Sequence, residues 1–182
     1  MLYLDTGKIY RLIAYFKIKY KKKYSYRFIK KKISKINLNK LENKNLLGDD
    51  VSTVASIIAK DPVIRKLVHK FQINCAYRFP KKFNGSCLDG RDITYKIIPD
   101  ADFKFFITAD IKIRAKRRFH ELKKIGKKVN QNSVINSIRI RDKNDYNRRI
   151  SPLKKTKDSI LINTSNLTKS ACFLKIKKII DR

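Results

Sequence analysis

The stretch from which the fold can be inferred is residues 87–110, C-L-D-G-R-D-I-T-Y-K-I-I-P-D-A-D-F-K-F-F-I-T-A-D. It joins two apolar runs through a charged turn. Gly90 allows the backbone to turn tightly between charged neighbours. Arg91 offers a planar five-donor fork suited to a phosphate, and Asp92 offers an acceptor beside it. An apolar strand that ends in D-G-R-D is typical of the rim of an open parallel sheet, where ligands bind beyond the carboxyl ends of the strands. The stretch therefore predicts a ligand site at a sheet edge.

The composition describes a globular chain with an unusual charge. With 182 residues and 42% hydrophobic content, the chain can bury a core, and we expect one domain. The formal charge of +31 has two explanations. One is compositional drift toward Lys, Ile and Asn in an AT-rich genome, and the other is a nucleic-acid partner for clustered Lys and Arg. We prefer drift, because the lysines are spread along the chain and the apolar spacing persists beneath them.

Cysteine and histidine usage gives no metal site. The three cysteines, Cys75, Cys87 and Cys172, stand far apart, and the chain has two histidines, so no zinc-ligand spacing can be built. We expect buried, reduced thiols in a cytoplasmic protein. No apolar run is long enough to span a bilayer and no secretory leader is visible, so we expect no membrane partner. A monomer is predicted.

Short strands alternate with amphipathic helices along the chain. Strands are predicted at residues 1–4, 85–88, 103–108 and 159–163, and residues 36–45 read as a connector. Helix starts are marked by capping residues; these are Thr6, Asp49 or Asp50, Asp61 before Pro62, Asp110, Asn130 or Asn132, and Ser165 or Thr168. This alternation of elements predicts an α/β protein.

A Lys/Tyr-rich run fills residues 17–32 and includes K-Y-K-K-K-Y-S-Y-R. Basic residues interleaved with aromatic ones can track and stack single-stranded nucleic acid. The alternative, which we prefer, is a solvated helix or a loop tip.

Two helical stripes carry arginines. Arg141, Asp145 and Arg148 are spaced i, i+4 and i+7, so all three can point into one cleft or form a surface ion-pair ladder. Arg114, Arg117 and Arg118 flank an apolar face at i, i+3 and i+4. Taken alone, the first stripe favours the surface ladder. Taken alone, Arg114 fits a solvated basic face as well as a binding site, and Arg118 fits the solvated face less well.

The quoted stretch also carries a resemblance to a known family. D-G-R-D-I followed by P-D-A-D-F-K-F-F-I-T-A resembles the central signature of the bacterial cytidylate kinases. The similarity continues in L-D-T-G-K-I-Y-R (residues 4–11), in R-A-K-R-R-F-H-E-L-K-K-I-G and in R-D-K-N-D-Y-N-R-R-I-S-P-L. It implies one three-layer α/β P-loop kinase domain, with helices on both faces of a short parallel sheet. Within that domain, residues 12–84 would be the region that binds the nucleoside monophosphate, and residues 112–150 the lid and the following helix.

The resemblance implies a reaction and a set of site residues. The reaction is transfer of the γ-phosphoryl group of Mg-ATP to CMP or dCMP, driven by positioning and charge neutralisation. The implied roles fall into four groups: Thr6, Arg11, Arg91 and Arg148 at the acceptor phosphate; Ser56, Arg65 and Asp92 at the cytosine; Arg141 and Asp145 at the ribose; and Arg114, Arg117 and Arg118 in the lid. No side chain is expected to ligate a metal. Without the resemblance, Ser56 and Arg65 would be read as solvent-facing helix residues, and Thr6 as a helix cap.

The sequence departs from the family pattern in two places. After Ile93 it has Thr94 and Tyr95, where relatives continue G-T-V-V-F, so side chains replace a glycine near the phosphates. It also has only 5 glycines and no G-x-x-x-x-G-K-[ST] loop, whose backbone cradles donor phosphates. We expect that a strand–loop–helix unit of roughly 30 residues is absent upstream.

That absence would remove the donor-phosphate site and a central strand. It leaves open a start-site error, a non-catalytic remnant, or a basic RNA-binding or ribosome-associated protein. An in-frame G-x-x-x-x-G-K-G-T upstream would restore the enzyme. The prediction that the chain binds the acceptor nucleotide does not depend on the upstream glycine-rich loop.

Overall fold

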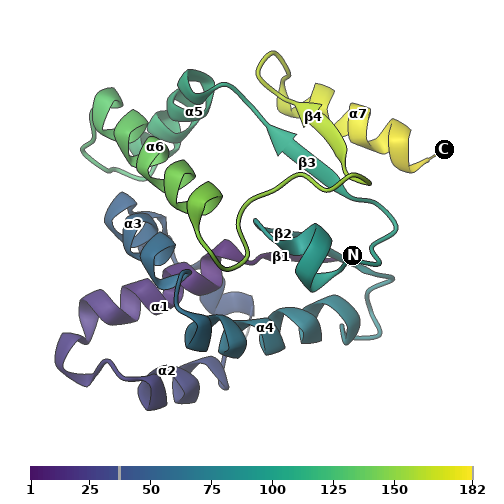
Figure 1. Ribbon diagram of the computed structural model, residues 1–182. Helices are drawn as coiled ribbons and strands as arrows, with labels where there is room; N and C mark the ends of the chain where they lie inside the picture. The colour runs from purple at the N-terminus through teal and green to yellow at the C-terminus, as the bar shows by residue number, and fades with distance from the viewer. Residues whose placement is uncertain (37, 182) are drawn as a thin grey trace.

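The computed structural model describes residues 1–36 and 38–181 and shows short strands surrounded by helices (Figure 1). The strands are β1 (Leu2–Asp5), β2 (Ser86–Asp89), β3 (Phe105–Thr108) and β4 (Ile160–Asn163). The α-helices are α1 (Gly7–Lys19), α2 (Tyr26–Ile33), α3 (Asp49–Ile58), α4 (Pro62–Tyr77), α5 (Ile111–Lys124), α6 (Gln131–Asn147) and α7 (Lys169–Ile180). Short 3₁₀ turns are η1 (Lys21–Lys23), η2 (Leu38–Glu42) and η3 (Lys44–Leu47), and η4 (Ile93–Ile97) is a π-helical turn.

The strands pair in parallel, as the predicted α/β class requires. β1 pairs with β2, from Leu2 opposite Ser86 to Asp5 opposite Asp89. β3 pairs with β4 in a second parallel pair. The α/β fold of short parallel strands is confirmed, and the predicted strand positions agree with these bounds within one or two residues. The single sheet that we expected is instead two separate pairs in the described part of the chain. The absent central strand stays a prediction.

Two clusters of buried apolar side chains hold the helices. The larger cluster joins β1 to α1, α2, α3 and α4, and it includes Ile9, Ile13, Ile29 and Val68, each 0% exposed. Each such side chain contributes about 1.5–3 kcal/mol through its burial. The smaller cluster lies between α5 and α6 and buries Ala115, Leu122 and Val134. The larger cluster fixes α1, α3 and α4 around the carboxyl ends of β1 and β2.

Capping residues account for most helix starts. Asp61, Asp110, Asn130 and Thr168 each accept a backbone N–H of their own helix through the side chain, as predicted. The predicted Asp49 or Asp50 cap is wrong, because Gly48 is the N-cap of α3. Both aspartates lie in the first turn of α3, where their negative charge interacts favourably with the helix dipole. Thr6 stands at the N-cap of α1, but its hydroxyl makes no capping bond.

Three less regular predictions have different outcomes. The interpretation of residues 17–32 as a solvated helix agrees with the structure, in which they comprise the end of α1, η1 and most of α2, with their lysines exposed. The connector predicted at 36–45 contains η2 and the start of η3, and Asn37 lies outside the described residues. The prediction of buried thiols is wrong for Cys87, which is exposed at the edge of β2; Cys75 and Cys172 are half-buried, and all three are unpaired.

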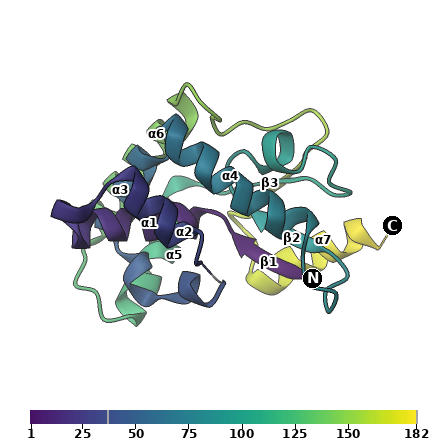
Figure 2. The same cartoon turned by 90° about the horizontal axis from the view of Figure 1, so that it is seen from below.

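The helices enclose the ends of β1 and β2 from opposite sides. In Figure 1, α5 and α6 lie above α1 and α3, while β3, β4 and α7 form the opposite side of the molecule. The view from below in Figure 2 shows the same separation of α7 from α1 and α2.

No helix in the described ranges is long and apolar enough to cross a membrane. The division into residues 12–84 and 112–150 stays a prediction.

Candidate functional site

A cavity of ≈ 280 Å³ opens where β1 and β2 end. Its walls come from the turns after both strands and from α1, α3, α4 and α6. It is lined by Asp5, Thr6, Gly7, Tyr10, Arg11, Ser52, Ala55, Ser56, Ala59, Arg65, Asp89, Gly90, Arg91, Asp92, Arg141, Asp145 and Arg148. The structure therefore brings together nine of the twelve residues singled out in the sequence, from five separate segments.

The floor of the cavity is a tight crossing of two turns. Asp5 and Asp89 lie opposite each other at the last paired position of the two strands. The Thr6 hydroxyl donates to the Asp89 carbonyl at 2.7 Å, which ties the first turn to the second. A Cβ at Gly90 would collide with the Thr6 hydroxyl oxygen, so only glycine fits this crossing. Glycine is required here for close approach.

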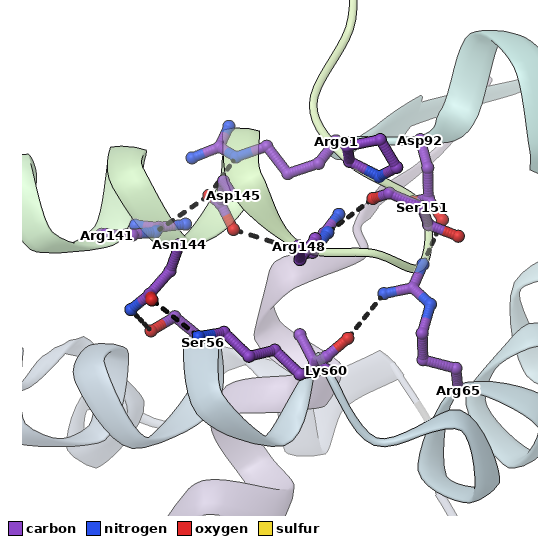
Figure 3. Close-up of polar contacts among 12 residues, drawn as sticks. Ser56, Lys60, Arg65, Arg91, Asp92, Arg141, Asn144, Asp145, Arg148 and Ser151 are labelled. Atoms are coloured by element: carbon purple, nitrogen blue, oxygen red, sulfur yellow. Dashed lines mark hydrogen bonds and ion pairs between the residues drawn. The ribbon is translucent and has the colours of Figure 1, made fainter.

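One buried carboxylate organises the arginines on one wall. Asp145, 4% exposed, accepts from Arg91 Nε at 2.8 Å through Oδ2, with Arg141 Nε 3.8 Å from the same oxygen. Arg148 approaches its other oxygen at 3.4 Å. Figure 3 shows the three guanidinium groups converging on this carboxylate from different directions. Arg141 and Asp145 on α6 and Arg148 at its C-cap thus point into a cleft, and Arg91 joins them from the β2 turn.

The charge balance of this wall favours an anion. Three guanidinium groups share one carboxylate, and Arg11 lines the same cavity. Burial, together with the neighbouring charges of Arg91 and Arg11, lowers the pKa of Arg141 to about 10. Burial likewise lowers the pKa of Arg11, whereas the pKa of Arg91 is raised despite its burial because of Asp145. A bound anion with two charges would relieve the repulsion among these cations.

The opposite wall holds a buried ion pair. The Arg65 guanidinium donates to the Asp92 carboxylate, and the two side chains are 8% and 6% exposed. A second Arg65 nitrogen donates to the Ala59 carbonyl at 3.1 Å. The Tyr10 ring lies over this guanidinium, 5.7 Å away. The pair holds a donor fork and an acceptor in fixed positions at the cavity edge, which is what a planar heterocycle requires for recognition.

Ser56 belongs to a polar chain that links α3 with α6. Its hydroxyl donates to the Thr53 carbonyl at 2.8 Å and accepts from the Asn144 amide at 3.2 Å. Lys60 then donates to the Asn144 side-chain oxygen at 2.8 Å. Figure 3 shows this chain running below the arginine cluster. Asn144 and Lys60 were missed in the sequence analysis. Asn144 lies one helical turn after Arg141, and this spacing could have indicated that it lies on the same side of the helix.

Two further lining residues were missed, and both carry buried polar atoms. The Tyr10 Oη and the Ser52 Oγ have no hydrogen-bond partner among the described residues. Burial raises the pKa of Tyr10 to about 12, so its hydroxyl keeps its proton. Such groups are rare in folded proteins unless a ligand or water completes them. They support a ligand site at this position.

The three predicted lid arginines do not line the cavity. Arg114 pairs with Asp142 at 2.8 Å, Arg117 donates to the Thr164 carbonyl at 2.6 Å, and Arg118 pairs with Glu121 at 2.7 Å. Arg118 also donates to the Leu47 carbonyl, which fastens α5 to the end of η3, just before α3. In this arrangement each guanidinium is satisfied within the protein.

The carboxylates at the strand ends are the groups suited to a cation. Burial raises the pKa of Asp89, and the charge of Asp5 raises it further. Two such oxygen donors match the ligand preference of Mg²⁺, which keeps several waters and takes one or two carboxylates. Among the described residues no group of three or more metal-binding side chains is present. Any cation here would therefore share its coordination with the ligand.

Comparisons with known proteins give one consistent result. The family model for cytidylate kinase matches residues 1–182. A cytidylate kinase of Bartonella tribocorum is 36% identical over 184 residues, covering 98% of this chain and 82% of that protein. One from Mesomycoplasma hyopneumoniae (strain 7448) is 35% identical over 195 residues, covering 100% and 82%. One from Clostridium botulinum (strain Okra / Type B1) is 34% identical over 190 residues, covering 100% and 87%.

Proposed function

Because the chain belongs to the cytidylate kinase family of phosphotransferases, we propose that it phosphorylates CMP and dCMP with Mg-ATP as the donor. The observation that carries the proposal is the cavity at the ends of β1 and β2. It places excess guanidinium charge on one wall and a fixed donor–acceptor pair on the other. These are the two recognition elements that a pyrimidine monophosphate requires.

Arg65 and Asp92 account for base selection. Cytosine presents an amino donor at N4 beside acceptors at N3 and O2, whereas uracil presents an acceptor at O4 and a donor at N3. The Arg65 fork can donate only, and the ionised Asp92 can accept only. With Ser56 on the facing helix, this wall matches the donors and acceptors of cytosine. Uracil would place a donor against a donor and an acceptor against an acceptor. Buried polar groups that are mismatched in this way disfavour the wrong ligand strongly.

The arginine wall accounts for the phosphate and the sugar. Arg11, Arg91 and Arg148 would hold the acceptor phosphate, with the Thr6 hydroxyl at the turn. Asp145 positions Arg91 and Arg148 and, with Arg141, would face the ribose. Positioned cations neutralise charge as the acceptor oxygen attacks in line, and no covalent enzyme intermediate is needed.

The donor side rests on family membership. Mg-ATP, when bound, supplies the phosphoryl group and a divalent charge that offsets the negative charge of the phosphates. The sequence led us to expect no side chain at the metal; with the structure, we propose instead that Asp5 and Asp89 would hold the cation. Arg114, Arg117 and Arg118 would have to release their present partners to reach a donor phosphate. The 182-residue sequence contains no glycine-rich cradle, so the donor subsite stays a prediction.

Calorimetric titration of the chain with CMP and with UMP tests the acceptor site. We expect CMP to bind at least 10-fold more tightly than UMP. Replacement of the buried Arg148 by Met should weaken CMP binding by about 10- to 100-fold, since a charged hydrogen bond contributes roughly 1.5–3 kcal/mol. Arg149→Met is the matched control, because Arg149 is exposed and does not line the cavity. Equal affinity for CMP and UMP, or equal losses in the two variants, would contradict the proposal.

Turnover is tested separately by CMP-dependent formation of ADP from Mg-ATP. CMP binding without turnover would place the deficiency on the donor side. The comparisons give no support to a protein whose main function is RNA binding or ribosome association, or to a non-catalytic remnant.

A further inference from the structure

A second charged region lies away from the cavity, in the N-terminal part of the chain. Residues 6–41 contain thirteen Lys or Arg residues and no Asp or Glu. Within them is a set of ten exposed cations, which with the aromatic rings between them we name the basic–aromatic surface. The ten are Lys17, Lys19, Lys21, Lys22, Lys23, Arg27, Lys30, Lys31, Lys32 and Lys35.

These ten cations lack the compensation seen elsewhere in the molecule. None of them forms an ion pair with a carboxylate in the described residues. Other basic side chains do, such as Lys8 with Glu42 at 2.8 Å and Arg114 with Asp142 at 2.8 Å. Compositional drift accounts for many lysines, but it does not account for the exclusion of acidic residues from one folded segment. Concentrated positive potential on a surface attracts a polyanion.

The segment is held in a defined shape, so the charges are positioned. Ile29 and Ile33 anchor α2 in the larger apolar cluster, and Ser25 caps the helix by accepting from the Phe28 amide at 3.2 Å. The Phe16, Tyr20 and Phe28 rings contact one another. Lys17 lies over the Tyr24 ring at 5.6 Å. Rings and ammonium groups thus contact one another within this segment.

We propose that the basic–aromatic surface binds single-stranded nucleic acid, in addition to the nucleotide bound in the cavity. The phosphates of the strand would replace the missing carboxylates, and exposed rings would stack on bases. Tyr26, 49% exposed, is the most accessible of these rings. An anionic membrane is disfavoured as the partner, because the aliphatic residues of α2, Ile29 and Ile33, are buried and not free to insert.

The proposal is independent of the kinase site. No residue from 12 to 51 lines the cavity, so saturating CMP should leave strand binding unchanged. The test is fluorescence anisotropy of a labelled single-stranded 12-mer of uridine, titrated with the full chain at several salt concentrations. A strand that contacts about five of these cations should bind roughly 100-fold more weakly at 200 mM than at 50 mM salt.

Two triple variants with the same change in charge separate a defined surface from net charge. Lys21→Gln/Lys22→Gln/Lys23→Gln removes three cations of the surface. Lys175→Gln/Lys177→Gln/Lys178→Gln removes three exposed cations of α7, which lies on the far side of the molecule in Figures 1 and 2. We expect the first variant to bind the 12-mer at least 10-fold more weakly than the second at 100 mM salt, with a shallower salt dependence.

Tyr26→Leu tests the stacking component. It should weaken binding about 5-fold or more at every salt concentration without changing the salt slope. Equal losses in the two triple variants would show attraction by net charge alone and overturn the proposal. So would an unaltered affinity in Tyr26→Leu, or binding of phosphatidylserine vesicles in place of the 12-mer with the same dependence on residues 21–23.

Discussion

The buried pair of Arg65 and Asp92 gives the sharpest prediction for stability. Replacing Asp92 by Asn leaves the Arg65 cation buried with one carbonyl and the Tyr10 ring as partners. Loss of one member of such a pair costs about 3–5 kcal/mol. The Tyr10 ring, 5.7 Å away, stays over the cation in both proteins, and we take the lower end of this range. We therefore expect a loss of about 3 kcal/mol from a total stability of roughly 5–15 kcal/mol.

Urea unfolding followed by circular dichroism measures this loss. With a slope of about 2 kcal/mol per molar urea, the midpoint of Asp92→Asn should fall by roughly 1.5 M. Glu42→Gln is the control, because Glu42 is paired with Lys8 at 2.8 Å but is 73% exposed. An exposed pair of this kind contributes about 0–1 kcal/mol.

A double-substituted protein separates stability from recognition. Arg65→Met/Asp92→Leu removes both charges and fills the space with apolar groups, which is nearly neutral for many buried pairs. We expect a coupling energy of more than about 3 kcal/mol between the single variants Arg65→Met and Asp92→Leu, and loss of CMP binding in a folded double variant. Strictly additive losses, or a shift in Asp92→Asn no larger than in Glu42→Gln, would refute the assignment of a tightly coupled buried pair.

Three further predictions concern the turns around the cavity. Gly90→Ala should destabilise the protein by about 1–3 kcal/mol through collision with the Thr6 hydroxyl, and Thr6→Ala/Gly90→Ala should recover part of the loss in urea unfolding. Because burial raises the pKa of Asp89, its ionised form destabilises the fold above that pKa, and the penalty disappears as the pH falls through it. Asp89→Asn should therefore raise the Tm at pH 8, and its advantage over the unsubstituted protein should shrink toward pH 4. Tyr95 donates to the Pro152 carbonyl at 2.5 Å, so Tyr95→Phe should lower the Tm by about 2–4 °C, corresponding to roughly 1 kcal/mol.

Local patterns in the sequence predicted the strands, most helix caps and part of the site. The spacing of Arg141, Asp145 and Arg148 required one helical face, and D-G-R-D placed Arg91 at a strand end. Both inferences depend on residues that are close together in the chain, and for that reason they could be made from the sequence alone. Ser56 and Arg65 carried no such pattern, and only the resemblance singled them out.

Contacts between distant segments account for what could not be predicted. Arg117 is held by Thr164 and Arg118 by Leu47, and both partners are far away in the sequence. The π-helical turn η4 after Asp92 also has no simple local signal. The unpartnered hydroxyl of Tyr10 depends on burial by several elements at once, which a helical periodicity does not reveal.

The division of the apolar interior has a consequence for motion. α5 and α6 share a small core of their own, and polar bonds from Asn144 to Ser56 and from Arg118 to Asp49 connect them to α3. A segment with so few buried contacts opens locally at a lower free energy than the rest of the fold. Amide hydrogens of α5 and α6 should therefore exchange with solvent well before those of α1. A mononucleotide that bridges α4 and α6 would join the two folding units and slow exchange in both.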